Sequence, residues 1–194
     1  MTKVIKGIIF DFDGVLVDSE NFYRSFWRDF FREQNLDYKT PPIGFTLDEY
    51  LKVIGMSNLR EEINKTKNIK ERIFFNSAPI NQHFESFIFE KVSELKFIIG
   101  SNNSSQIIRK FLKRNNLEGM ILDVITPDCG FKPKPSPDIF NECLKRMDLP
   151  RDYVLVIEDS QIGIVAADSA GLISLLLPFP KVKEDIEVLS NYFD

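Results

Sequence analysis

Five short apolar runs constrain the fold of this chain more than any other feature. Most are rich in β-branched residues and are bounded by Gly, Pro, Asp or Ser, which is typical of buried strands. The runs are Ile5–Phe10, Phe97–Gly100, Ile121–Ile125, Tyr153–Ile157 and Leu172–Leu177. Between the later runs, apolar residues such as Ile108, Phe111 and Leu112 recur at helical spacing. Strands that are apolar on both faces and alternate with helices predict an α/β fold with a three-layer, Rossmann-like parallel sheet.

The segment between the first two runs is too long for a simple crossover and carries helical patterns of its own. In its first part, ENFYRSFWRDFFREQ, aromatic residues form two adjacent stripes along a helix. Further amphipathic stretches run through Leu47–Ile54 and Ile63–Phe75. We therefore expect a helical subdomain at residues 16–90, inserted into an α/β core that comprises residues 1–15 and 91–194.

The charge of the chain argues against nucleic acid as a partner. The formal net charge is -4, and no block of basic residues is long enough to form a phosphate-backbone patch. The apolar run near the N-terminus is too short for a signal peptide, and no run is long enough to cross a membrane. We therefore expect a cytoplasmic protein that has no membrane partner.

The cysteine and histidine content excludes several kinds of chemistry. Cys129 and Cys143 lie far from any CxxC spacing, which disfavours a disulfide scaffold or a zinc site. His83 is the only histidine, so a His-rich metal site is excluded, and we expect this residue to have a surface or helix-end role. Acid–base work would therefore depend on carboxylates, lysines or tyrosines.

Polar side chains follow four of the predicted strands. In chain order they are Asp11 and Asp13, then Ser101, Asn102 and Asn103, then Lys134 within FKPKPSPD, and finally Glu158 and Asp159. The carboxyl ends of parallel strands meet at one edge of a sheet, where ligands bind. The sequence therefore predicts acids from two strands, a hydroxyl group and a lysine at one edge.

The acids at this edge suit a magnesium ion. Mg2+ prefers oxygen ligands, keeps several waters, and usually takes one or two carboxylates together with a substrate phosphate. Asp11, Asp13 and Asp159 would supply such ligands. The alternative is that these residues serve only as helix caps and turns, and Asp159 or Ser160 suits the start of a helix after the fourth strand. The combination of acids from separate strands favours the metal site.

Two further segments at this edge suit an anion. Pro133 and Pro135 flank Lys134 and restrict its backbone, so the lysine can act as a fixed positive charge; Lys132 is the alternative. Ser101 begins SNNSS, which offers successive backbone N–H groups near a helix start. Alone, each segment is also compatible with an ordinary turn or cap.

Four motifs, taken in order, resemble those of the haloacid dehalogenase-like hydrolase superfamily. They are IIFDFDGVLVDSE, FIIGSNNS, FKPKPSPDIF and VLVIEDSQIGIVAADSAG. The resemblance is greatest to the branch of beta-phosphoglucomutase-like and phosphoglycolate-phosphatase-like enzymes, which carry a helical cap after the first motif. It covers the α/β core, whereas the predicted helical subdomain matches only in position and helical character.

The resemblance implies a role for each residue of the site. Asp11 would be the nucleophile that takes the phosphoryl group. Asp13 would protonate the leaving oxygen and then activate water. Ser101, Asn102 and Lys134 would bind the phosphoryl group. Because the dehalogenases and phosphonatases lack an acid at the place of Asp13, the resemblance implies phosphate chemistry.

The metal site implied by the resemblance draws on the same strands. Asp11, Asp159 and the backbone carbonyl of Asp13 would bind Mg2+, and Glu158 would be a ligand or would support one. The expected activity is hydrolysis of a small phosphomonoester, and the expected substrate is a phosphorylated metabolite. A monomer is favoured, although the sequence leaves the oligomeric state open.

Two departures from the family pattern bear on the reaction. The beta-phosphoglucomutases usually carry a histidine where this chain has Tyr23, and an arginine where it has Asn58. Both changes favour a phosphatase over a phosphosugar mutase, which stays an alternative. A third possibility is a regulatory module that binds a metabolite and has no catalytic activity.

A basic stripe on the first predicted helix of the subdomain has two interpretations. Arg24, Arg28 and Arg32 lie on one helix face at four-residue spacing. They could meet an anionic substrate, but a solvated face beside the aromatic stripes is favoured. Lys52 and Arg60 are alternative contacts for the substrate.

Overall fold

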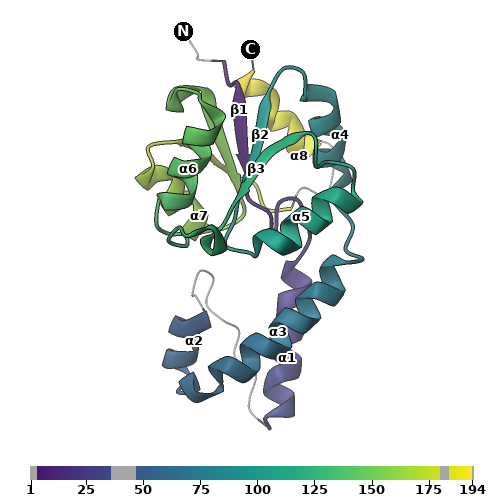
Figure 1. The fold of residues 1–194 in the computed structure, drawn as a ribbon, viewed down its shortest axis with the longest axis vertical. Coiled ribbons are helices and arrows are strands. Elements are labelled where there is room, and N and C mark those ends of the chain that lie inside the picture. Colours follow the sequence, from purple (N-terminus) through teal and green to yellow (C-terminus); the bar gives the residue numbers. More distant parts are fainter. Residues whose placement is uncertain (1–3, 36–46, 180–183, 194) are drawn as a thin grey trace. The chain divides into compact units, whose positions relative to one another are not determined.

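The computed structural model describes residues 4–35, 47–179 and 184–193 of the chain. It contains two compact units (Figure 1). The core unit comprises Met1–Asp18 and Pro79–Asp194, and the helical unit comprises Ser19–Ala78. None of the described helices combines the length and hydropathy that crossing a bilayer requires.

A five-stranded parallel sheet forms the centre of the core unit, in the order β3-β2-β1-β4-β5. Its strands are β1 (Gly7–Phe10), β2 (Lys96–Gly100), β3 (Ile121–Ile125), β4 (Val154–Glu158) and β5 (Ile173–Leu176). All five predicted strands are thus confirmed. Strands β1 and β4 are buried along their whole length, whereas β5 lies at the edge and leaves Ile173 and Leu176 exposed. The expectation that every strand is buried on both faces is therefore wrong for β5 and for part of β3, where Leu122 is exposed, because both strands lie at the edges of the sheet.

Helices cover both faces of the sheet, as predicted (Figure 1). The helices of the core unit are α4 (Gln82–Lys91), α5 (Ser105–Arg114), α6 (Asp138–Met147), α7 (Gln161–Ser169) and α8 (Glu184–Glu187). Short 3-10 turns occur at Pro127–Cys129, Arg151–Tyr153 and Val188–Tyr192. On one face, Phe140 of α6 and Ala166 of α7 pack in a buried cluster with Ile9 of β1. On the other face, Phe10 contacts Phe84 of α4, with 5.2 Å between ring centroids.

The division into units differs from the predicted one slightly at its first boundary, which follows Asp18 instead of residue 15, and more at its second boundary. The sequence placed residues 16–90 together, but α4 belongs to the core unit. Phe84 and Ile88 of this helix are fully buried, and Phe87 lies 6.1 Å from Phe97 of β2 between ring centroids. An amphipathic pattern shows that a helix has an apolar face but does not show which unit covers that face.

Three helices and one 3-10 turn make up the described part of the helical unit. They are α1 (Glu20–Glu33), α2 (Leu47–Val53), the turn Ser57–Leu59 and α3 (Arg60–Phe75). The predicted aromatic stripes of α1 form the core of this unit: Phe26, Trp27, Phe30 and Phe31 are buried, and Trp27 meets Tyr50 of α2 edge to face at 5.2 Å. Burial of these large aromatic side chains contributes favourably to the stability of the helical unit.

Candidate active site

The register of the central strands brings the predicted site residues to one edge of the sheet. Phe10 of β1 pairs with Ile99 of β2 and with Ile157 of β4. The next residue, Asp11, donates its N–H to the Ile157 carbonyl at 2.9 Å, and so lies level with Glu158. The predicted meeting of acids from two strands is therefore present in the structure.

A buried ion triad joins three of these residues. Lys134 Nζ lies 2.7 Å from Asp11 Oδ1 and in very close contact with Glu158 Oε1. The Lys134 side chain is only 3% exposed. Burial opposes its charge, but Asp11 and Glu158 outweigh this effect and raise the pKa of Lys134 above its ordinary value. By contrast Lys132, the alternative in the sequence, is exposed.

The triad leaves an excess of negative charge around Asp11. Burial raises the pKa of Asp11 well above its ordinary value; Lys134 opposes this rise, while Glu158, Asp159 and Asp13 add to it. For Asp11, burial and the neighbouring acids therefore outweigh the effect of Lys134. An additional positive charge at this place would lower the pKa of Asp11 again.

Asp11, Glu158 and Asp159 form a cluster that could bind a metal ion. Each offers one carboxylate oxygen, and these oxygens lie within 4.8 Å of one another. Burial, together with Glu158 and Asp13, raises the pKa of Asp159 to about 7. A set of hard oxygen donors with excess negative charge fits a divalent cation.

Within this cluster, Glu158 has most of its hydrogen-bonding capacity engaged by the protein. Its Oε1 contacts Lys134, and its Oε2 accepts from the Ser160 hydroxyl at 3.1 Å and from the Asp159 and Ser160 N–H groups. A Cβ atom on Gly163 would come within 1.8 Å of the Glu158 carboxyl carbon. The glycine of EDSQIG thus makes room for this carboxylate, which holds Lys134 in place.

The turn after β1 brings the DFDG segment against Asp159. Gly14 has φ +70, and a Cβ atom there would lie 1.8 Å from Asp159 Oδ2. The Gly14 N–H donates to the Val17 carbonyl at 2.8 Å, and the apolar residues of this turn are fully buried. The sequence pattern DG therefore marks both a turn and a close approach to the carboxyl group of Asp159.

The SNNS segment after β2 connects the other site residues. Ser101 is buried, and its Oγ accepts from the Asn103 N–H at 3.2 Å. Asn102 was predicted to bind phosphate, but its side-chain amide pairs with the backbone of Lys134. Asn103 donates from Nδ2 to Asp13 Oδ2 at 2.7 Å. Sequence reasoning missed this role of Asn103, whose only signal was its place two residues after Ser101.

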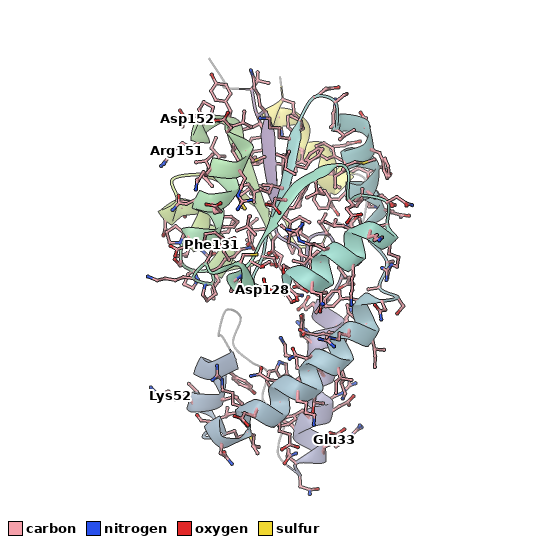
Figure 2. All side chains as sticks on the ribbon, viewed as in Figure 1. Glu33, Lys52, Asp128, Phe131, Arg151 and Asp152 are labelled. Atoms are coloured by element: carbon pink, nitrogen blue, oxygen red, sulfur yellow. The ribbon has the colours of Figure 1, made fainter. Side chains whose placement is uncertain are left out.

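Asp128, which the sequence did not single out, supports the same edge from β3. Its Oδ2 accepts from the Ser105 N–H and hydroxyl, both at 3.0 Å, and from the Ser104 hydroxyl at 3.3 Å. Figure 2 shows Asp128 at the site end of the core unit, with Arg151 and Asp152 at the opposite end. The loop after β3 is thereby joined to the loop after β2.

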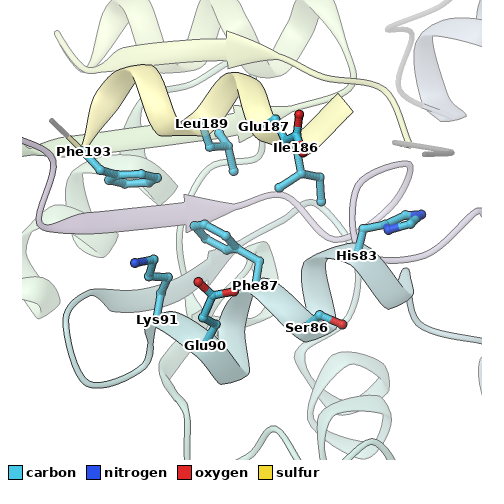
Figure 3. A pocket seen from close by; sticks show the side chains of 9 residues that line it. All are labelled: His83, Ser86, Phe87, Glu90, Lys91, Ile186, Glu187, Leu189 and Phe193. Carbon is cyan, nitrogen blue, oxygen red and sulfur yellow. The ribbon is translucent and has the colours of Figure 1, made fainter. Parts of the chain in front are cut away.

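A separate cavity of about 480 Å3 lies between α4 and the C-terminal segment. Figure 3 shows Phe87 and Lys91 of α4 facing Leu189 and Phe193. His83 also lines this cavity and sits in the first turn of α4, where its N–H donates to Asn81 Oδ1 at 3.0 Å. None of the acids of the cluster lines the cavity, so the chemistry of the strand edge and not cavity size defines the site.

The arginine stripe of α1 makes exposed ion pairs within the helical unit. Arg24 pairs with Glu20 at 2.6 Å, and Arg32 pairs with Asp29 at 3.2 Å. The three arginine side chains of the stripe are each more than 60% exposed. These contacts agree with the favoured interpretation as a solvated face.

Comparison with known proteins assigns the chain to a family. The profile described as haloacid dehalogenase-like hydrolase matches residues 8–177. The chain is similar to a phosphorylated carbohydrates phosphatase of Thermotoga maritima, with 25% identity over 181 residues, 87% of this chain and 82% of the relative. It is also similar to a beta-phosphoglucomutase of Bacillus subtilis, with 25% identity over 193 residues, 88% of this chain and 82% of the relative.

Among solved structures, the fold is similar to that of CbbY from Rhodobacter sphaeroides in complex with phosphate. The TM-score is 0.68 at 20% identity, over 90% of this chain and 87% of that chain. The order of the strands, the acids at their carboxyl ends and the profile match agree with one another. The chain therefore belongs to the haloacid dehalogenase-like hydrolases.

Proposed function

We propose that this protein is a Mg2+-dependent phosphatase that hydrolyses a small phosphomonoester through an aspartyl-phosphate intermediate. The observation that carries the proposal is the environment of Asp11. Its carboxylate contacts Lys134 at 2.7 Å and lies within 4.8 Å of an Asp159 oxygen. These contacts support Asp11 as the nucleophile, Lys134 as a fixed cation beside it and Asp159 as a ligand of the divalent ion.

In the first step, an oxygen of Asp11 attacks phosphorus and the bond from phosphorus to the ester oxygen breaks. Asp13 gives its proton to that oxygen, so the alcohol leaves neutral. Lys134 offsets the negative charge of the phosphoryl group, and the Ser101 hydroxyl donates to one of its oxygens. Ser101 Oγ already accepts from the Asn103 N–H, which directs the hydroxyl proton elsewhere.

In the second step, water attacks phosphorus and the bond to Asp11 breaks. Asp13, now a carboxylate, takes a proton from the attacking water, and inorganic phosphate leaves. The net reaction consumes one ester and one water and yields one alcohol and one phosphate. The same carboxyl group thus serves as acid and then as base, which its place beside Asp11 in DFD allows.

Mg2+ would be held by Asp11 and Asp159, with the backbone carbonyl of Asp13 as a third ligand. When bound, it neutralises charge on the phosphoryl oxygens and lowers the pKa of Asp11. Glu158 would support this arrangement indirectly, because its oxygens already contact Lys134, Asp159 and Ser160.

A phosphorylated sugar is the substrate class that the relatives support. The Thermotoga maritima relative is named for phosphorylated carbohydrates. The similarity to a beta-phosphoglucomutase keeps a phosphosugar mutase as the second candidate. Tyr23 and Asn58 occupy the places where that branch usually carries histidine and arginine, and this favours hydrolysis.

The test is phosphate release from a panel of phosphorylated sugars and other small phosphoesters, with Mg2+ and with a chelator. We expect hydrolysis of at least one sugar phosphate that the chelator abolishes and that Asp11→Asn lowers by about 10^3-fold or more. Formation of an isomeric sugar phosphate with little free phosphate would instead select the mutase. Unchanged turnover by Asp11→Asn would remove the proposed nucleophile.

A further inference from the structure

We infer that the consecutive residues Asn102 and Asn103 are positioning residues that set the two groups flanking the transferred phosphoryl group. Asn102 fixes Lys134, and Asn103 fixes the carboxyl group of Asp13. A single turn after Ser101 thereby aligns the cation and the acid with each other. This inference rests on the proposed function and assigns to the two amides tasks other than phosphate binding.

Asn102 holds Lys134 through both polar atoms of its side chain. Its Oδ1 accepts from the Lys134 N–H at 2.8 Å, and its Nδ2 donates to the Lys134 carbonyl at 3.2 Å. Pro133 and Pro135 have no N–H, so the N–H of Lys134 is the only backbone donor among these three residues. Its bond to Asn102 therefore decides where this segment lies relative to the loop after β2.

Asn103 fixes the orientation of Asp13. Its Oδ1 accepts from the Ser104 N–H at 2.7 Å, so its Nδ2 must face the carboxyl group, where it donates to Asp13 Oδ2 at 2.7 Å. In a carboxylic acid, the carbonyl oxygen accepts a hydrogen bond more strongly than the hydroxyl oxygen, so a donor to one oxygen favours the proton on the other. The amide thus selects Asp13 Oδ1 as the oxygen that delivers the proton to the leaving group.

The loop that carries both amides is itself anchored on two sides. The Ser101 N–H donates to the Ile125 carbonyl at 3.1 Å, at the end of β3. Asp128 accepts from Ser104 and Ser105 beyond the second amide. A loop held at both ends can keep two side chains in a fixed orientation, which a mobile loop cannot do.

The two roles predict different kinetic signatures. An alkyl phosphate needs a proton on its leaving oxygen, whereas p-nitrophenyl phosphate has a good leaving group that needs none. In Asn103→Ala, we expect kcat/KM to fall by about 10- to 100-fold for the alkyl ester and by less than about threefold for the aryl ester. In Asn102→Ala, we expect a similar loss on both esters and weaker inhibition by inorganic phosphate, by about tenfold.

The experiment measures both esters and phosphate inhibition with wild type, Asn102→Ala, Asn103→Ala and Asn103→Ser. In Asn103→Ser, the serine can still accept from the Ser104 N–H but is too short to reach Asp13. This variant should therefore show the same selective loss on the alkyl ester, and it keeps the test valid if Asn103→Ala does not fold. Asn141→Ala, an exposed change on α6, is the matched control and should leave both esters unaffected.

Equal losses on both esters in the Asn103 variants, or no loss, would overturn the role of Asn103. Unchanged phosphate inhibition in Asn102→Ala would overturn the role of Asn102. A wild-type protein that hydrolyses neither ester with Mg2+ would remove the proposed function itself, and this inference with it. The two kinds of failure are therefore distinguishable.

Discussion

The two units of this protein surround their buried charges very differently. In the core unit, Lys134 is 3% exposed and contacts two buried carboxylates, those of Asp11 and Glu158. In the helical unit, Glu71 is 4% exposed, and its Oε1 accepts from Tyr23 at 2.7 Å and from Lys67 at 2.8 Å. Lys67, however, is 31% exposed and keeps contact with water.

This difference distinguishes an ion cluster that is buried throughout from an ion pair that is partly exposed. Each charged group in a buried ion cluster loses its hydration energy. Removal of one partner therefore leaves the remaining charges buried and unpaired, which is strongly destabilising. The pair in the helical unit leaves one member able to reach solvent, and the unit relies mainly on aromatic packing. We therefore expect substitutions at the sheet edge to be costly for both stability and activity, and substitutions in the helical unit to be milder.

The largest effect should come from Lys134→Met, which leaves Asp11 and Glu158 buried without their cation. We expect the free energy of unfolding to fall by about 3–5 kcal/mol in the absence of Mg2+, and phosphatase activity to fall by about 10^2- to 10^3-fold or more. Chemical denaturation and phosphate release measure the two effects. Lys132→Met, in the same loop but exposed, is the matched control and should change neither quantity; a loss there equal to that of Lys134→Met would refute the distinction between the two lysines.

A second prediction concerns pH and follows from the raised pKa of Asp159, about 7. In the unfolded chain Asp159 has the ordinary aspartate pKa of about 4, so its protonation stabilises the metal-free fold fully below about pH 4, and this contribution is lost as pH rises from there through about 7. Because a cation must displace the proton from Asp159, its apparent affinity should rise by up to about tenfold per pH unit below this pKa through that one carboxyl group.

The measurement is the shift in melting temperature that Mg2+ causes, followed from acidic to mildly basic pH. We expect this shift to grow with pH up to about 7, the pKa of Asp159. Asp159→Asn should weaken the shift and reduce its pH dependence. A metal-induced shift that is the same at every pH in wild type would contradict the linkage between this carboxyl group and the cation.

An intermediate effect is expected from Gly14→Ala, with Gly55→Ala of the helical unit as its control. The two glycines have nearly the same backbone angle, φ +70 and +74, so alanine should cost about 1 kcal/mol of stability at either place. Only at Gly14 would the new Cβ displace Asp159, whereas no atom of the described residues lies within 4 Å of a Cβ on Gly55.

We therefore expect Gly14→Ala to raise the Mg2+ concentration needed for half-maximal activity by about 10-fold or more, and Gly55→Ala to leave it unchanged. Titration of activity with Mg2+ provides the comparison. Equal Mg2+ requirements in the two variants would show that the close approach of Gly14 to Asp159 has no part in metal binding.

The smallest effect should come from Glu71→Gln in the helical unit. Glutamine retains an oxygen that can accept from Tyr23, and Lys67 can turn to solvent. We expect the free energy of unfolding to fall by only about 1 kcal/mol, as measured by chemical denaturation. A decrease in the free energy of unfolding as large as that of Lys134→Met would contradict the expected difference between the two units and would indicate a function for the buried Glu71.

Much of this arrangement could be predicted from the sequence, because it depends on local patterns. The five apolar runs gave the strands, and the placement of Asp11, Lys134 and Glu158 after strands predicted their meeting at one edge. The place of α4 could not be predicted, since Phe84 is buried by contact with Phe10, far away in the chain. Periodicity identifies an apolar face but carries no information about its partner.

The roles of the side-chain amides of Asn102 and Asn103 could not be predicted from the sequence either. Asn102 and Asn103 are adjacent and identical, yet one contacts the backbone of Lys134 and the other contacts Asp13. These partners lie 32 and 90 positions away in the chain, and only the folded loop decides which amide meets which group. The sequence can therefore predict which residues belong to a polar cluster, but the role of each side chain depends on contacts that form only in the folded loop.

The most direct test of the central claim is a single turnover of p-nitrophenyl phosphate by Asp13→Asn. The aryl leaving group needs no proton, but this variant lacks the base that activates water, so the phosphoryl group should remain on the enzyme. We predict a burst of p-nitrophenol equivalent to the enzyme present, and mass spectrometry that places one phosphoryl group on Asp11. The absence of a burst, or a phosphoryl group on any other residue, would contradict the role of Asp11 as the nucleophile.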